Sequence, residues 1–357
     1  MPSQLTLSSP TASRQDTQEV ARSPWAGRLI QRVNAIAGNV QASNDVHEEE
    51  QHKANMHQLA PFVANLLGYT LKDDTATMEA PLFSLSTKPD MDTWSWISPD
   101  KKKWLEVTPS SIGRATIHDK DLLIYLTSQV VAAMNDAARC SAKMPSRCIR
   151  FTLHDFLIAT GRDTAGKSYA SVKSTIDRLS GTRLKTNIEM GNIDWRTSFR
   201  LIEPTDHVIE MDINGIKRTK SIEITLSEWL YRALERKKIL TITPHYFMLR
   251  KPLEKRLYEI ARKHVGEQSE WFIKEDNLRA KTGSKANIRE FRRMLNAIID
   301  DDNIPDYRMA TRRSEKGENM VRFYPKSAKK IALAYAKEGK SEHTTHCAIS
   351  QRRNISD

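Results

Sequence analysis

The chain has 357 residues, of which 56 are Lys or Arg and 44 are Asp or Glu, giving a formal net charge of +12. No apolar run approaches the roughly 20 residues of a membrane-spanning helix, the N-terminal residues lack the apolar segment of a secretory signal, and three cysteines make no disulfide framework, so a cytoplasmic protein is expected. The first 100 residues hold 7 basic against 12 acidic residues, so the remainder carries +17 and favours a polyanionic partner such as nucleic acid.

The first 104 residues are predicted to precede the main folded body. Residues 1–23 are rich in Ser, Thr, Gln and Pro and are predicted to be a disordered tail. Residues 24–104 form an acidic, helical extension, in which apolar residues at helical spacing predict helices over 24–40 and 45–67. Residues 70–103 lack such a pattern and are predicted to be loop.

Residues 105–235 have the element order of a winged helix-turn-helix domain, with three helices before a β-hairpin. Apolar residues at helical spacing predict helices over 119–138, 151–161 and 167–179. Thr152 and Asp155 have capping-box spacing at the start of the second helix. Alternating sequences predict two hairpins, 183–190 with 195–201 and 208–213 with 216–226, the latter joined by the turn signal Asn-Gly.

The same order returns in residues 240–335. The spacing predicts helices over 252–264, 274–281 and 287–300 and strands over 307–313 and 320–324. The pattern F-x-x-x-D-x-L-x-A also recurs, at residues 151–159 and 272–280, and Thr-Gly follows each copy closely. We therefore expect a helix-rich α+β fold with two tandem winged helix-turn-helix domains, an N-terminal helical extension and a flexible tail over 336–357.

Residues 161–168 read GRDTAGKS and match the phosphate-binding pattern G-x-x-x-x-G-K-[ST] in full. A P-loop requires a buried strand before the glycines, because its backbone N–H groups cradle phosphate at the start of the next helix. Here the preceding residues have the spacing of a capped helix, and no alternating series of strands and helices surrounds the motif. A turn between two helices is the favoured interpretation, and a P-loop ATPase is the alternative from another class.

Catalytic and metal chemistry find little support in the sequence. We identify no catalytic constellation, and we expect no cofactor. His343, His346 and Cys347 offer three zinc ligands, whereas structural zinc takes four, so no metal is expected. A binding protein rather than an enzyme is therefore the prediction.

The predicted helix over 287–300 presents a surface suited to reading DNA. Three arginines and two asparagines lie on or beside its outward face, and these side chains pair with guanine and adenine in the major groove. An ordinary solvated helix is the alternative. The following hairpin adds basic residues for phosphate contacts. The expected DNA contacts of this domain are Lys285, Asn287, Arg289, Arg292, Arg293, Asn296, Arg308, Arg312, Arg313, Lys316 and Arg322.

The third helix of the first domain is less basic than its counterpart. We expect weaker base reading there and mostly phosphate contacts. A purely structural or dimerising role is the alternative of equal weight, since dimeric arrangements are common among such DNA readers. The candidate residues are Lys167, Ser168, Tyr169, Ser171, Lys173 and Ser174.

Several segments resemble the plasmid replication initiators of the RepA type. In the first domain these are residues 107–125 (VTPSSIGRATIHDKDLLIY), 128–129 (SQ), 160–162 (TGR), 166–167 (GK), 178–182 (RLSGT) and 186–188 (TNI). In the second domain they are residues 250–264 (RKPLEKRLYEIARKH), 289–292 (REFR) and 304–307 (IPDY). The likeness covers about residues 107–324, and the first 100 residues carry none of it.

The resemblance implies tandem winged-helix domains that bind direct repeats (iterons) in double-stranded DNA at a plasmid origin, open the nearby duplex and recruit host replication proteins such as the replicative helicase. It also implies a plasmid-encoded bacterial protein, a homodimer formed through the first winged helix, and repression of its own promoter in copy control. A non-enzymatic replication initiator is the expected function. A winged-helix transcriptional regulator is the nearer alternative. The acidic N-terminal region is a candidate docking segment for host factors.

Overall fold

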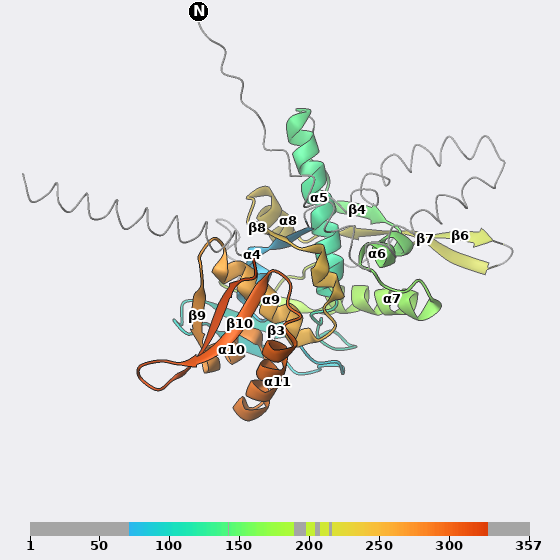
Figure 1. Ribbon diagram of the computed structural model, residues 1–357. Coiled ribbons are helices and arrows are strands. Elements are labelled where there is room, and N and C mark those ends of the chain that lie inside the picture. Colours follow the sequence, from blue (N-terminus) through green and yellow to red (C-terminus); the bar gives the residue numbers. More distant parts are fainter. Residues whose placement is uncertain (1–70, 142, 189–197, 204–207, 214–215, 328–357) are drawn as a thin grey trace, which may run out of the picture. The chain divides into compact units, whose positions relative to one another are not determined.

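The computed structural model describes residues 71–141, 143–188, 198–203, 208–213 and 216–327 (Figure 1). The helices expected over 24–40 and 45–67 and both terminal tails lie outside these residues. Within the described ranges, no helix is both long enough and apolar enough to cross a membrane.

Three helices and an antiparallel sheet follow one another in the expected order between residues 120 and 225, which we call the N-terminal unit. The elements are α5 (Lys120–Arg139), β4 (Cys148–Phe151), α6 (Leu153–Ala159), α7 (Gly166–Gly181), β6 (Val208–Ile213) and β7 (Ile216–Thr225). The strand order is β4-β7-β6. The side chain of Thr152 accepts a hydrogen bond from the N–H group of Asp155 at 3.0 Å, so Thr152 caps α6 as its spacing indicated.

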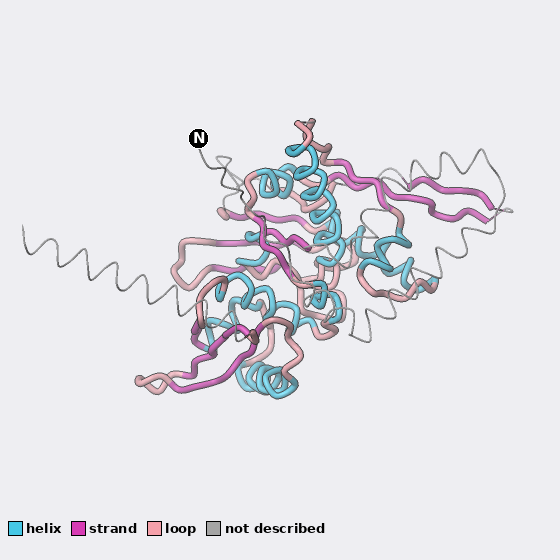
Figure 2. The backbone as a smooth tube through the Cα atoms, turned by 45° about the horizontal axis from the view of Figure 1, so that its top comes forward, coloured by secondary structure: helices cyan, strands magenta, loops and turns pink. Residues whose placement is uncertain are grey.

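Residues 252–325, which we call the C-terminal unit, repeat this order. The elements are α9 (Pro252–Val265), β9 (Trp271–Lys274), α10 (Glu275–Thr282), α11 (Ile288–Asp301), β10 (Tyr307–Arg313) and β11 (Asn319–Pro325). In both units the strand between the first two helices pairs with the last strand of the hairpin. Figure 2 shows the two hairpins, β6–β7 and β10–β11, as extended two-stranded arms. The sequence repeat occupies equivalent places, because Leu157 and Leu278 are both buried in the second helix.

The prediction of loop over residues 70–103 is correct for 80–93 and 98–103 and wrong for 71–79 and 94–97. This segment contains β1 (Leu71–Asp74), α4 (Thr75–Glu79) and β2 (Trp94–Ile97). Strand β1 pairs with β8 (Ile239–Ile242), which lies between the two units, so its partner is far away in sequence. The carboxylate of Asp74 caps the short α4 by accepting from the N–H groups of Ala76 and Thr77 at 3.1 and 2.8 Å.

The expected hairpin of residues 183–190 with 195–201 is also corrected. Strand β5 (Arg183–Thr186) pairs with β3 (Trp104–Thr108), and β3 pairs in turn with β2. Leu184 and Val107 face each other in this sheet and are both buried, which favours the long-range pairing. In the described residues, a single bridge from Leu184 to Phe199 represents the expected hairpin. Helix α8 (Glu228–Glu235), strand β8 and the short 3-10 helix over Pro244–Met248 were not predicted from the sequence.

The two units share apolar packing. Phe291, Leu295 and Ile298 of α11, which the helical pattern placed inward, are buried. Ile124 of α5 and Leu71 of β1 belong to the same apolar cluster as these side chains. The N-terminal end of α5 lies beside α9 (Figure 1). The helices of one unit are therefore supported by residues from the other.

Gly283 ends α10 in a left-handed conformation, with φ of +76°, and a Cβ atom there would lie 2.6 Å from the Cβ atom of Pro81. We expect Gly283→Ala to lower the free energy of unfolding by about 2 kcal/mol, because strain and steric overlap add. Urea denaturation followed by circular dichroism measures this loss. Gly317→Ala is the matched control, since Gly317 has φ of +75° and open space around it. Equal losses would show that the contact with Pro81 contributes nothing.

Candidate nucleic-acid interface

A groove lies between the exposed face of α11 and the β10–β11 hairpin. We call this hairpin the wing. Arg292 and Asn296 lie one helical turn apart on α11, so both side chains point toward the same side of the helix. Arginine and asparagine side chains match the hydrogen-bonding edges of guanine and adenine. The groove is lined by Glu275, Arg292, Asn296, Thr311, Arg312, Arg313 and Asn319.

Neighbouring carboxylates orient two arginines of α11. Nε and Nη2 of Arg292 donate to the carboxylate of Glu275 at 2.9 to 3.1 Å, and Arg293 pairs with Glu290 at 2.6 Å. Arg289 is exposed and has no ion pair within the described residues. Each ion pair fixes the orientation of its guanidinium, and any base or phosphate that bound Arg292 or Arg293 would have to replace the carboxylate.

The wing carries basic side chains along both strands and around its tip. Arg312 lies over the ring of Phe272, with 4.1 Å between the guanidinium carbon and the ring centroid. Arg322 pairs with Glu270 at 2.6 Å and lies over the ring of Tyr324. At the base of the wing, Arg308 pairs with Asp302 at 3.0 Å. Arg313 and Lys316 are exposed and have no ion pair in the described part of the chain.

The residues before α11 have intramolecular roles that the sequence pattern did not reveal. The side-chain oxygen of Asn287 accepts from the N–H group of Glu290 at 3.0 Å and caps the helix. Nζ of Lys285 lies 2.8 Å from a carboxylate oxygen of Asp90 and 2.9 Å from one of Asp92. A phosphate contact by Lys285 therefore has to displace these two carboxylates.

Helix α7 presents fewer cations than α11. The hydroxyl of Tyr169 lies 3.4 Å from Nδ1 of His154, and the hydroxyl of Ser174 donates to the carbonyl of Ala170 at 3.3 Å. These contacts tie two candidates to their own surroundings, whereas the two lysines are free of ion pairs in the described residues. Three candidates are exposed, namely Lys167, Ser171 and Lys173, and three are half-buried, namely Ser168, Tyr169 and Ser174.

Residues 160–165 connect α6 to α7 as a turn, and residues 166–168 of the motif are the start of α7. Gly161 has φ of +63° after α6, and α7 begins at Gly166, so no buried strand precedes the motif. Arg162, inside the motif, pairs with Asp121 of α5 at 2.8 Å. The segment joins three helices and lacks the strand–loop–helix context of a P-loop.

We expect Lys167→Ala to leave DNA affinity independent of ATP, as in the unaltered protein. Removal of one phosphate contact would reduce the slope of log affinity against log salt by about 0.9 at most. Fluorescence anisotropy with a labelled duplex, with and without Mg²⁺ and ATP, measures both quantities. ATP-dependent binding that disappears in the variant would restore the P-loop interpretation.

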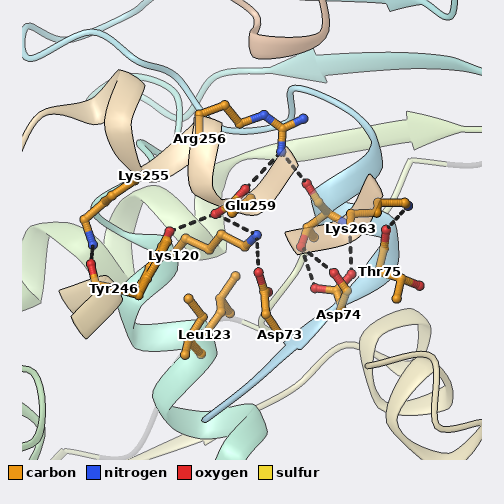
Figure 3. A network of polar contacts seen from close by, with 12 residues as sticks. Asp73, Asp74, Thr75, Lys120, Leu123, Tyr246, Lys255, Arg256, Glu259 and Lys263 are labelled. Carbon is orange, nitrogen blue, oxygen red and sulfur yellow. Dashed lines mark hydrogen bonds and ion pairs between the residues drawn. The ribbon is translucent and has the colours of Figure 1, made fainter. Parts of the chain in front are cut away.

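A buried network of charges joins the first helices of the two units (Figure 3). Nζ of Lys120 in α5 lies 2.7 Å from Asp73 of β1 and 3.0 Å from Glu259 of α9, and these side chains are at most 3% exposed. Glu259 also pairs with Arg256 at 2.9 Å and accepts a hydrogen bond from the hydroxyl of Tyr246 at 2.8 Å.

A second buried pair lies beside the first. Nζ of Lys255 in α9 is 2.7 Å from a carboxylate oxygen of Asp121 in α5, and burial lowers the pKa of Lys255. Burial acts on Lys120 in the same direction, but Asp73 and Glu259 outweigh it and raise the pKa of Lys120 above its usual value. Removing one partner while the helices stay packed would leave a buried, unpaired charge, which is strongly unfavourable. The pairs Lys120–Glu259 and Lys255–Asp121 both cross from α5 to α9, so the network matches specific residues of the two units to each other.

This network could not be found in the sequence. Lys120, Lys255 and Glu259 lie in charged, helix-forming segments, where a solvated helix face is the usual interpretation, and Asp73 lies in a segment predicted to be loop. Nothing local indicates that α5 and α9 pack against each other. A usable signal would have required knowledge of long-range contacts.

Comparison with known proteins agrees with the architecture. The family model described as "Replication initiator protein A" matches residues 72–309. A protein of Wigglesworthia glossinidia brevipalpis named "Putative replication protein" is 36% identical over 239 residues, which are 67% of this chain and 84% of that protein. A crystal structure of domains 2 and 3 of RctB superposes with a TM-score of 0.51 at 14% identity, covering 71% of this chain and 98% of that one. The fold is accordingly mixed α+β and winged-helix-like.

Proposed function

Because the chain belongs to the replication initiator protein A family, we propose that it initiates plasmid replication by binding double-stranded repeats (iterons) at the origin. The observation that supports this proposal best is the groove between α11 and the wing, which gathers Arg292 and Asn296 with basic wing residues. Members of this family are generally non-catalytic DNA-binding proteins, so the proposal assigns no reaction to the chain.

In this proposal, residues 105–235 and 240–335 are two winged-helix domains that dock on one duplex. Helix α11 enters the major groove and reads bases, and the wing contacts phosphates through residues such as Arg313 and Lys316. Helix α7 contacts phosphates, with Lys167 and Lys173 as its cations. The bound protein helps to open the neighbouring duplex and recruits host replication proteins such as the replicative helicase.

Two further activities belong to the proposal. A homodimer formed through the first winged-helix domain represses the protein's own promoter. The residues ahead of β1, which include the acidic run Glu48–Glu50, dock host factors, because a cluster of acidic side chains suits a basic partner surface. Deletion of residues 1–70, which leaves β1 and all following elements in place, tests the docking role. Loss of replication with unchanged origin binding supports it, and unchanged replication refutes it.

A minimal plasmid-replication assay tests the function. The gene for this protein and its origin are placed on a plasmid that cannot otherwise replicate in the host. Stable transformants that depend on the intact gene are expected. Origin binding and promoter repression without any replication would instead identify a transcriptional regulator.

A further inference from the structure

Residues 84–93, which we call the strap, lie between the two helices that are proposed to face DNA. Thr87 and Lys88 line a groove together with Ser171 of α7. Leu85 lines a second groove together with Arg293 of α11. Figure 1 shows teal loops between α7 and α11. A duplex that spans both helices therefore passes the strap.

The strap is exposed but firmly anchored. The carboxylate of Asp90 accepts from the guanidinium of Arg114 at 2.9 Å and from the hydroxyl of Ser84 at 2.7 Å. A Cβ atom on Gly113 would lie 3.1 Å from the backbone nitrogen of Asp90, so the backbones pack closely. Burial opposes ionisation of Asp90, but hydrogen bonds from Lys285 and Ser84 and the charge of Arg114 lower its pKa to about 2. An ordered loop loses little conformational entropy when it binds a partner.

The exposed residues of the strap carry groups that bind phosphate. Ser86 and Thr87 offer hydroxyls, and Lys88 offers an ammonium group without an ion pair in the described residues. Such donors make many of the contacts between proteins and the DNA backbone. The carboxylates of the strap oppose this role weakly, because Asp90 is buried and Asp92 is already paired with a lysine.

Building on the proposed function, we propose that the strap is a third DNA-contacting element. It holds the sugar-phosphate backbone of the duplex between the segments contacted by α7 and α11. The contact carries no sequence information, but it fixes the path and register of the duplex across both units. The origin duplex then contacts α7, the strap and α11 along one continuous sugar-phosphate backbone.

Substitutions of Lys88 test this proposal in the full-length chain with origin duplex. Lys88→Ala removes the cation and Lys88→Glu reverses it, and neither disturbs a side-chain ion pair in the described structure. The matched controls are Lys143→Ala and Lys143→Glu. Lys143 is exposed and lies just beyond the C-terminal end of α5, whereas the strap borders the N-terminal end of this helix. Helix α5 has 20 residues, so at 1.5 Å per residue its two ends are about 30 Å apart.

We expect Lys88→Ala to reduce the slope of log affinity against log salt by about 0.9 and Lys88→Glu to weaken binding further. In ethylation interference, the Lys88 variants should lose the signal at phosphates that lie between those contacted by α7 and those contacted by α11. The Lys143 variants should match the unaltered protein. Lys88 variants with unchanged slopes and interference would overturn the role of the strap alone. An unaltered protein that does not bind the origin duplex would overturn the proposed function and the strap together.

Discussion

Lys120→Met is expected to lower the free energy of unfolding by about 3–5 kcal/mol, which is the cost of removing one partner from a buried ion pair. Lys120 is fully buried, and its Nζ atom lies within 3.0 Å of carboxylates from both β1 and α9. The variant leaves Asp73 as a buried carboxylate without an ion pair among the described residues, whereas Glu259 keeps its pair with Arg256. Guanidinium chloride denaturation, followed by tryptophan fluorescence, measures the change.

Two comparisons separate the network from a general effect of losing a lysine. Lys274→Met removes the same side chain from an exposed pair with Glu318, and it should change stability little. Adding Asp73→Asn to Lys120→Met should restore part of the lost stability, because one unpaired carboxylate becomes neutral. An equal loss in the Lys274 variant, or a double variant less stable than the single one, would contradict the structural role given to this network.

Arg292→Ala is expected to weaken binding to the origin repeat by about 1–3 kcal/mol and to relax its sequence preference. The reason is its place beside Asn296 in the groove between α11 and the wing. Fluorescence anisotropy with the origin duplex and with a scrambled duplex measures the two effects. Because Arg292 also pairs with Glu275, Glu275→Gln serves as the control for loss of that ion pair, and it should retain specific binding.

Arg293→Ala is the matched comparison, since it removes the same side chain from the next position of the same helix. Arg293 lies toward the strap and not in the groove of the wing. We therefore expect a weaker loss that is similar on both duplexes, as a phosphate contact would give. If the Arg293 variant loses sequence preference and the Arg292 variant keeps it, the proposed orientation of α11 on DNA is wrong.

The helices of both units and the hairpins β6–β7 and β10–β11 were predictable because their signals are local. The apolar residues of α11 follow the helical period. Thr152 begins α6 and Gly283 ends α10 through contacts with residues a few positions away. The exposed arginines and asparagines of α11 could be identified for the same reason. A helical period fixes which side chains point inward and therefore which remain outside.

The remainder depends on long-range contacts that no local pattern contains. Strand β5 pairs with β3 and not with the expected partner that follows it closely in sequence. Strand β1 pairs with β8, which lies between the two units. The carboxylates that hold Arg292 and Lys285 come from other elements, so their ion pairs could not be predicted. The strap looked like an ordinary loop, because its position between α7 and α11 follows from how the units pack.

Selection of bound duplexes from a random pool tests the central claim most directly. The full-length protein is mixed with random-sequence double-stranded DNA, and the bound fraction is amplified and sequenced over several rounds. We predict that one short motif becomes enriched and that this motif recurs as direct repeats in the plasmid's own origin. Bound pools that share no motif, or a motif absent from the origin, would contradict the assignment of this chain as an initiator that reads origin repeats.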